Sequence, residues 1–349
     1  MNSGEFYYFC FFLIFISIAL FFDLGIFNKH DRIIKSKQAA LKTAVWVFLA
    51  FLFYLFLNFY GEKIHGISDF DGLRSHVNKY GQTFIINEQN YTQSISNYRN
   101  ELSLEFLTGY VIEEALSMDN LFVIILIFSA FNVEKRLYHR VLFWGIIGAV
   151  VFRFIFIFTG AFLITKFEWI IYLFAIFLIF TGIRMFLNRN EEEKIETDSH
   201  PVVKFASRYF SIHEHFVGNK FTVKINHKRL ITPLFLVLLI IEFTDILFAV
   251  DSIPAIFAVT KDPFIVFFSN IFAILGLRSM FFLLINVMHK FHFFKHGLSL
   301  LLVFIGLKMV FNDWLKSVGF NIEYSLIIIG LIMTISIVLS LLIPEKKRT

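Results

Sequence analysis

Six carboxylates stand inside apolar segments of this 349-residue chain, in two groups with the same internal spacing. They are Glu113, Glu114, Asp119, Glu242, Asp245 and Asp251. In each group two acids lie six residues apart, and a polar residue, Asn120 or Ser252, follows the second acid. Carboxylate, amide and hydroxyl oxygens are hard ligands that suit Mg²⁺, Ca²⁺ or Mn²⁺. The pattern therefore predicts an oxygen-lined site for a divalent cation, to which both groups contribute.

Helical geometry would place these polar side chains on shared faces. At about 100° per residue, positions seven apart stand on the same face of a helix. Glu113 therefore aligns with Asn120, and Asp245 aligns with Ser252. A charge at the centre of a bilayer costs roughly 2.5–3.5 kcal/mol, so acids retained there indicate a function. We expect Glu113, Asp245, Asp119 and Asp251 to converge in one hydrated cavity near the middle of the membrane.

Basic residues follow each acidic group and predict partial charge balance. Arg153 and Arg278 each stand in the next apolar segment, a few residues after a glycine. We interpret both as counter-ions, with Lys308 as a third, and Glu114 and Glu242 as either further ligands or part of this balance. Six acids against three bases leave a net negative site, which favours a bound cation or shared protons. The alternative is a set of salt bridges that only lock helices together.

Pro254 follows Asp251 by three residues and predicts a break in the helix that carries the second group. Proline has no amide hydrogen and clashes with the preceding turn. The freed carbonyls of Val250 and Asp251 would be further oxygen ligands where they line a cavity.

The elements that position these residues are predicted to be membrane-spanning helices. Hydrophobic residues make up 57% of the chain and charged residues 17%, against about 25% charged in soluble domains. Nine apolar stretches are long enough to cross about 30 Å of hydrocarbon. They lie near residues 6–22, 43–59, 104–129, 141–165, 168–187, 231–259, 264–286, 298–315 and 324–343. The fold class predicted is an all-α polytopic membrane protein.

Lysine and arginine counts between the stretches predict the orientation. One set of alternate gaps, including the basic tail from residue 344, holds 21 of these residues, and the opposite set holds 7. Basic residues collect on the cytoplasmic side. The N-terminus is therefore predicted outside and the C-terminus in the cytoplasm.

The repeated acids divide the chain into two copies of a three-helix unit. We expect two N-terminal membrane helices in residues 1–60, an extracytoplasmic loop in 61–103, the first unit in 104–187 and a cytoplasmic loop in 188–230. The second unit follows in 231–315, and the last membrane helix and basic tail occupy 316–349. Because each unit has an odd number of helices, the second is inverted relative to the first, as in many secondary transporters.

The two long gaps leave little room for a separate catalytic domain. Residues 60–103 are polar without strong periodicity, and alternating apolar residues near 221–231 predict a short hairpin. No GxxxxGK[ST] phosphate-binding motif occurs, so the chain is not expected to drive transport with ATP, nor to be an enzyme.

Several of these segments resemble the TerC family of bacterial membrane proteins. The resemblance rests on residues 109–122 (GYVIEEALSMDNLF), 242–255 (EFTDILFAVDSIPA), 263–278 (PFIVFFSNIFAILGLR) and 304–308 (FIGLK). It implies an inner-membrane protein related to amino-acid and cation exporters, with members that export manganese. The acids at 113 or 114, 119, 245 and 251, with Asn120 and Ser252, fall on the acidic motif positions of the family.

The function expected is export of a divalent cation, with Mn²⁺ chosen through the resemblance and protons as the counter-ion. The cation would be a substrate rather than a cofactor, and the lipid bilayer is the expected partner, with no nucleic acid. A second hypothesis is an assembly or scaffold factor without transport, in which the acids are structural. A third is an exporter of another small solute. The oligomeric state does not follow from the sequence.

Overall fold

The structure, a computed structural model, describes residues 3–23, 36–80, 86–87, 89–167, 169–188, 201–225, 228–285, 291 and 293–343. These ranges hold twelve α-helices, one short 3₁₀ helix and two strands. The first helices are α1 Ser3–Asp23, α2 Ser36–Ile64, α3 Phe70–Tyr80, α4 Tyr91–Ala130, η1 Lys135–Leu137, α5 Tyr138–Lys166, α6 Ile170–Leu187 and α7 Pro201–Tyr209. The strands β1 Thr222–Ile225 and β2 Lys228–Ile231 precede α8 Pro233–Phe257, α9 Pro263–Leu284, α10 Phe294–Val310, α11 Asn312–Ser317 and α12 Ile322–Leu342.

Long apolar helices dominate this architecture, and the prediction of an all-α polytopic membrane protein is confirmed. Among the described residues, six segments are long and apolar enough to cross a membrane: Ser36–Ile64, Lys135–Lys166, Ile170–Leu187, Pro233–Phe257, Pro263–Leu284 and Ile322–Leu342. A shorter apolar helix covers Phe6–Ala19. Many large apolar side chains point outward from these helices, Phe51, Ile155 and Leu331 among them. Large apolar side chains exposed on so many helices suit lipid rather than water.

Three segments differ from the boundaries predicted for them. Residues 61–103, expected to form a loop without strong periodicity, contain α3 and the first turns of α4. The Asn90 side chain accepts a hydrogen bond from the amide of Gln93 at 3.0 Å, which caps α4 and starts it well before the predicted span. The predicted span 298–315 divides at Phe311 into α10 and α11. Residues 189–200 and the basic tail 344–349 lie outside the described residues.

The predicted hairpin is confirmed between α7 and α8. Strands β1 and β2 pair in antiparallel register, with Val223 opposite Leu230 and Ile225 opposite Lys228. Thr232 and Pro233 then begin α8, with proline at the first helical position, where its missing amide hydrogen costs nothing.

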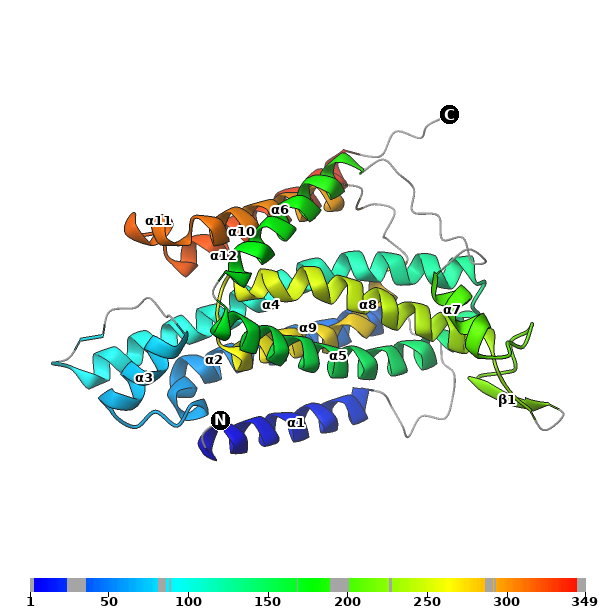
Figure 1. Ribbon diagram of the computed structural model, residues 1–349, viewed down its shortest axis with the longest axis horizontal. Coiled ribbons are helices and arrows are strands. Elements are labelled where there is room, and N and C mark those ends of the chain that lie inside the picture. Colours follow the sequence, from blue (N-terminus) through cyan, green and yellow to red (C-terminus); the bar gives the residue numbers. More distant parts are fainter. Residues whose placement is uncertain are drawn as a thin grey trace.

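Helices α4–α6 and α8–α10 form two three-helix units that interlock (Figure 1). Contacts between α4 and α8 run antiparallel, because Glu105 meets Thr260 at one end and Asn120 meets Asp245 further along. Helix α4 packs against α9, and α8 packs against α5 in the corresponding way. Helices α6 and α10 pack on each other. This exchange of neighbours between two antiparallel units is the arrangement expected of inverted repeats.

A glycine in the third helix of each unit brings α6 and α10 together. Gly182 lies in the run FTGIRM and Gly306 in the matching run FIGLKM, a repeat that the spacing of the acids does not include. A Cβ atom at Gly182 would lie 2.8 Å from the backbone oxygen of Ser299, and one at Gly306 would lie 2.8 Å from that of Ala175. Both positions therefore need glycine for the close approach of the two backbones.

Replacing Gly182 with alanine should lower the free energy of unfolding by about 1–3 kcal/mol, because the new methyl group meets a backbone atom that cannot rotate away. Gly330 in α12 is the matched control, since a Cβ there meets nothing within 4 Å. Gly330→Ala should keep or raise stability by up to about 1 kcal/mol through helix propensity. Thermal unfolding of the purified protein in detergent measures both. Equal stability of the two variants would contradict the close approach.

Helix α9 forms the centre of the bundle, between α2, α4 and α5. The apolar stretch of α9 is long enough to span a membrane, yet it is buried along its whole length by the other helices. Phenylalanine rings fill much of this interface; Phe268, for example, lies 4.2 Å from Phe12 and 5.4 Å from Phe53 between ring centroids. Such a core fixes the polar side chains of α9 against α4 and α5.

Candidate functional site

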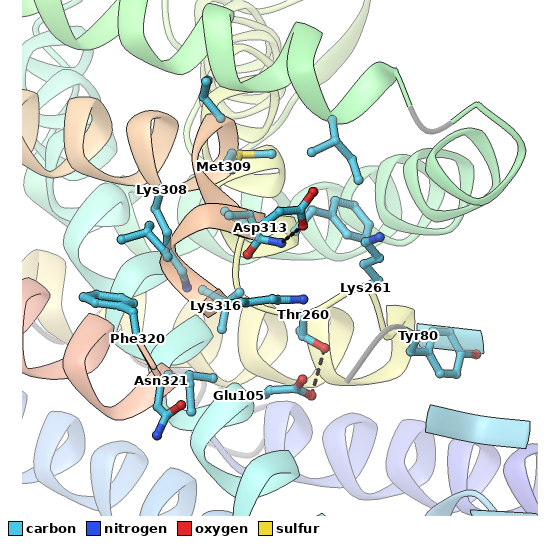
Figure 2. A pocket seen from close by; sticks show the side chains of 18 of the residues that line it. Tyr80, Glu105, Thr260, Lys261, Lys308, Met309, Asp313, Lys316, Phe320 and Asn321 are labelled. Atoms are coloured by element: carbon cyan, nitrogen blue, oxygen red, sulfur yellow. Dashed lines mark hydrogen bonds between the residues drawn. The ribbon is translucent and has the colours of Figure 1, made fainter. Parts of the chain in front are cut away.

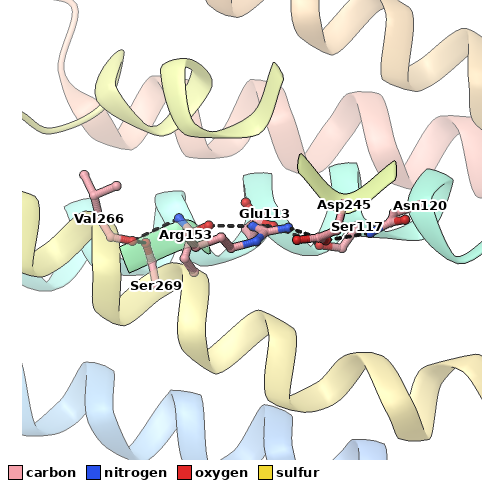
Figure 3. Close-up of polar contacts among 8 residues, drawn as sticks. Glu113, Ser117, Asn120, Arg153, Asp245, Val266 and Ser269 are labelled. Atoms are coloured by element: carbon pink, nitrogen blue, oxygen red, sulfur yellow. Dashed lines mark hydrogen bonds and ion pairs between the residues drawn. The ribbon is translucent and has the colours of Figure 1, made fainter. Parts of the chain in front are cut away.

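Two of the predicted acids meet around one arginine in the interior of the bundle (Figure 3). Arg153 of α5 is only 1% exposed, and its guanidinium forms an ion pair with Glu113 of α4, which is fully buried. The same guanidinium lies 3.4 Å from Oδ1 of Asp245 in α8. Arg153 is thus the shared counter-ion of one acid from each unit. We call Glu113, Arg153 and Asp245 the central ion triad.

Uncharged side chains hold the central ion triad in place. Asn120 donates to Oδ1 of Asp245 at 2.9 Å, and Ser117 donates to Oε1 of Glu113 at 3.0 Å. Asn270 of α9 accepts from Arg153 at 2.6 Å, and its own amide group donates to the backbone oxygen of Val266 at 3.0 Å. Buried charges are tolerated when hydrogen bonds satisfy them from several sides.

The triad carries one positive and two negative charges, so it remains negative by one unit. This arrangement has features of both hypotheses from the sequence: the ion pairs join α4, α5 and α8, and the excess charge attracts a cation or a proton. The ligand role predicted for Glu113 and Asp245 therefore requires that an incoming cation compete with Arg153.

The other predicted first-choice ligands lie on the same two helices. Asp119 and Ser252 are buried on α4 and α8. Asp251 is half-buried and lies within hydrogen-bonding reach of Thr181 in α6. Convergence of Asp119 and Asp251 with the triad in one hydrated cavity stays a prediction.

Pro254 does not end its helix, because α8 continues to Phe257. The break expected at Pro254 is therefore wrong, because the proline lies inside a continuous helix. The missing amide hydrogen of the proline still removes the partner of the carbonyl of Val250. This carbonyl lies beside Asp251 in the sequence, and its role as a ligand stays a prediction.

Glu114 and Glu242 pack against glycines of the neighbouring arginine-bearing helices. Tyr110 donates its hydroxyl to Oε1 of Glu114 at 2.9 Å, and the same oxygen would lie 3.3 Å from a Cβ at Gly276. The carboxylate of Glu242 lies directly over Gly148, where no Cβ would fit. In both units a glycine thus leaves room for a carboxylate a few residues before the arginine.

Arg278 lies apart from the ion pairs of Arg153. Its guanidinium hydrogen-bonds Nδ1 of His139 at 2.8 Å, at the start of α5. Arg278, Asn120 and Asp245 all line one small cavity of about 30 Å³. That volume is enough for about one water molecule or a small cation next to the triad.

A larger polar cavity of about 310 Å³ opens at the end of the bundle where α8 meets α9 (Figure 2). Its charged lining residues are Glu101, Glu105, Lys261, Lys308, Asp313 and Lys316. We call it the Lys308 cavity. Lys308 therefore balances Glu101 and Glu105 in this cavity rather than the central ion triad.

A second buried cluster was missed at the sequence level. It joins His65, which follows α2, and His76 in α3 to Asp262 before α9. Burial alone would raise the pKa of Asp262, but the charges and hydrogen bonds of His65 and then His76 outweigh burial and hold this pKa well below its usual range. No metal-ligand spacing announces the cluster, because its members come from three separate elements. The only local signal is Asp-Pro at the start of a helix.

The fold and the buried charges define a polytopic α-helical membrane protein with acids between two three-helix units. Residues 98–348 match the model of the integral membrane protein TerC family, and the chain belongs to this family. The resemblance seen in the acidic motifs is thereby confirmed.

Similar proteins cover nearly the whole chain. An uncharacterized membrane protein of Myxococcus xanthus is 42% identical over 338 residues, which are 97% of this chain and 93% of that protein. Alx of Photorhabdus laumondii is 38% identical over 339 residues, 97% of this chain and 95% of its own. Alx of Escherichia coli K12 is 40% identical over 304 residues, with shares of 87% and 85%. The name of both Alx proteins calls them candidate membrane-bound redox modulators. No solved structure matches this chain.

Proposed function

We propose that this protein is a secondary transporter that exports a divalent metal cation, with Mn²⁺ as the substrate, in exchange for protons. The observation that carries the proposal is the excess of acids between the two units. Helices α4 and α8 carry six carboxylates within their apolar segments, whereas the neighbouring helices α5 and α9 carry two arginines there, Arg153 and Arg278. A cation or protons must neutralise such an excess in a low dielectric.

The site chemistry supports a hard cation. The predicted ligands are carboxylates, the amide of Asn120, the hydroxyl of Ser252 and the backbone near Pro254. These oxygens suit Mg²⁺, Ca²⁺ and Mn²⁺, and the choice of Mn²⁺ among them follows from the family resemblance. Competition between the cation and Arg153 would control access to the site. The bound cation displaces the guanidinium from the acids, and the ion pairs re-form when the cation is released.

Export requires energy, which protons supply. We place the protein in the bacterial cytoplasmic membrane with its N-terminus outside, following its basic residues. Moving a divalent ion out against 100 mV costs about 4.6 kcal/mol. Acids that exchange the metal for entering protons couple the two flows. In this orientation the Lys308 cavity opens to the outside and serves as the exit vestibule.

A redox role of the kind named for the Alx relatives would need an electron carrier other than a pair of thiols within this chain. The sequence contains one cysteine, Cys10, so it has no internal dithiol pair. Control of a redox-active metal ion such as Mn²⁺ would connect transport with such a role. The scaffold hypothesis differs in one respect: it predicts no ion flux.

A vesicle flux assay tests the proposal. The purified chain is reconstituted into liposomes that contain a Mn²⁺ reporter, with the interior made acidic relative to the bath. We expect Mn²⁺ to enter faster than in vesicles of equal pH on both sides, and the interior to become more alkaline as protons leave. Ca²⁺, Mg²⁺ and Zn²⁺ are compared under the same gradient.

Two results would contradict the proposal. Flux equal to that of protein-free vesicles for all four ions would favour the scaffold hypothesis. Mn²⁺ entry that does not depend on the pH gradient would indicate a passive pore, which cannot export against the membrane potential.

A further inference from the structure

His65, His76 and Asp262 form a compact buried cluster at the end of the bundle where α8 connects to α9. The three residues are 3%, 7% and 0% exposed. One nitrogen from each ring and one carboxylate oxygen all lie within 4.8 Å of one another. We propose that this cluster binds a divalent first-row transition-metal ion, at a site separate from the intramembrane acids and beyond the export function proposed above.

The distances suit a common metal ion. Nε2 of His65 lies 3.0 Å from Oδ2 of Asp262, and Nε2 of His76 lies 3.7 Å from the same oxygen. An ion about 2.1 Å from each of these atoms would see the two separations at angles of about 90° and 120°, which tetrahedral and octahedral sites tolerate. The ring centroids are 4.0 Å apart, so the imidazoles present their nitrogens from neighbouring positions.

The cap of α9 orients the carboxylate toward the histidines. Oδ1 of Asp262 accepts a hydrogen bond from the amide of Phe264 at 2.9 Å. This bond occupies one carboxylate oxygen and turns Oδ2 to the two rings. In metal sites of proteins, a coordinating carboxylate is usually also hydrogen-bonded to the protein, which fixes its orientation. The orientation therefore exists before any ion arrives.

The ligand types select the class of ion. Imidazole nitrogen favours Zn²⁺, Co²⁺, Ni²⁺ or Mn²⁺ over Mg²⁺ and Ca²⁺, which take oxygen ligands. Three protein ligands leave at least one position open for water, as in exchangeable rather than closed zinc sites. The cluster thus differs in chemistry from the all-oxygen site on α4 and α8.

The cluster is next to the Lys308 cavity, which gives an ion a route in. Tyr80 lines that cavity and lies 4.6 Å from the ring of His76. The backbone amide of Asp262 donates to the hydroxyl of Thr260, which donates to Glu105 in the same cavity. A bound ion would tie α2 and α3 to the start of α9 and stabilise this end of the bundle by mass action.

The competing explanation is a histidine–aspartate ion pair that binds no metal, because the 3.0 Å separation also suits a hydrogen bond. Metal binding itself separates the two explanations. The probe is Co²⁺, whose visible absorption reports nitrogen coordination, added to the untagged full-length protein in lipid nanodiscs. Stoichiometry is read by metal analysis after dialysis, and thermal unfolding is followed with and without Co²⁺.

Four matched proteins are compared with the wild type. His65→Gln/His76→Gln removes the rings, and Asp262→Asn removes the charge while an amide oxygen can still cap α9. His213→Gln/His215→Gln removes two histidines near β1, away from the cluster. Asp119→Asn/Asp251→Asn removes acids of the proposed transport site only.

We expect the wild type, the His213/His215 variant and the Asp119/Asp251 variant to retain one Co²⁺ with nitrogen coordination. The His65/His76 variant should lose it, and Asp262→Asn should bind it at least about tenfold more weakly. Co²⁺ should raise the unfolding temperature of the wild type. A wild type without nitrogen-coordinated Co²⁺ overturns the proposal whether or not the variants fold, as does unchanged binding in both cluster variants. If the wild type carries no ion flux in the vesicle assay but still binds Co²⁺ at the cluster, only the proposed export function is refuted.

Discussion

Replacing Arg153 with methionine should lower the free energy of unfolding by about 3–5 kcal/mol, the largest stability effect expected of a single substitution in this protein. The reason is electrostatic rather than steric, because methionine fills much of the same volume. Glu113 is fully buried and Asp245 nearly so, and both pair with this guanidinium. Without it, two carboxylates would share a low-dielectric interior, which is tolerable only if protons bind.

The control for Arg153→Met is Arg184→Met. Arg184 also interrupts an apolar helix, α6, but its side chain is exposed, so its loss should change stability by no more than about 0.5 kcal/mol. The triple variant Arg153→Met, Glu113→Gln, Asp245→Asn should recover much of the lost stability, because no unpaired charge remains. Denaturant unfolding in detergent micelles measures all three. If Arg153→Met is as stable as Arg184→Met, the central ion triad does not hold the bundle together.

Local patterns account for the helices that carry the acids, and their limits explain what was missed. Apolar length marks α5, α8 and α9, and alternating apolar residues mark the hairpin before α8. The first turns of α4 are polar and have no apolar period; the Asn90 side chain caps them, and Arg99 pairs with Glu62 of α2. Apolar length and alternation in the sequence therefore predict the helices and strands that they mark. They do not predict the polar first turns of α4, which contacts with another helix stabilise.

The same division applies to the candidate site. Residue type and depth in the membrane single out Glu113, Arg153 and Asp245, but their pairing depends on the approach of three helices. The assignment of Lys308 to this charge balance failed for that reason, since the end of α10 places it beside Glu101 and Glu105. The histidine cluster was invisible for the same reason. When the residues of a site come from elements far apart in the sequence, no characteristic spacing between them marks the site.

Neutralising Asp119 and Asp251 should abolish the proposed export while leaving the fold intact, the largest functional effect expected. Each acid stands six residues after an acid of the triad, one on α4 and one on α8. Neither is an ion-pair partner of Arg153, so asparagine leaves the central ion triad complete. The carboxylates would be lost both as metal ligands and as proton carriers. We expect Asp119→Asn and Asp251→Asn each to lower Mn²⁺ flux by about 100-fold.

The measurement is Mn²⁺ flux in the vesicle assay, with protein content and unfolding temperature determined for each preparation. Glu134→Gln is the matched control, because Glu134 is an exposed acid between α4 and α5 that pairs with Arg136. It should transport like the wild type. Metal affinity of the wild type should rise with pH, because protonated carboxylates bind metal poorly and deprotonate as pH increases. The aspartate variants should lose much of this pH dependence. Wild-type flux from both variants would remove Asp119 and Asp251 from the mechanism, and flux would then have to depend on the acids that Arg153 already pairs.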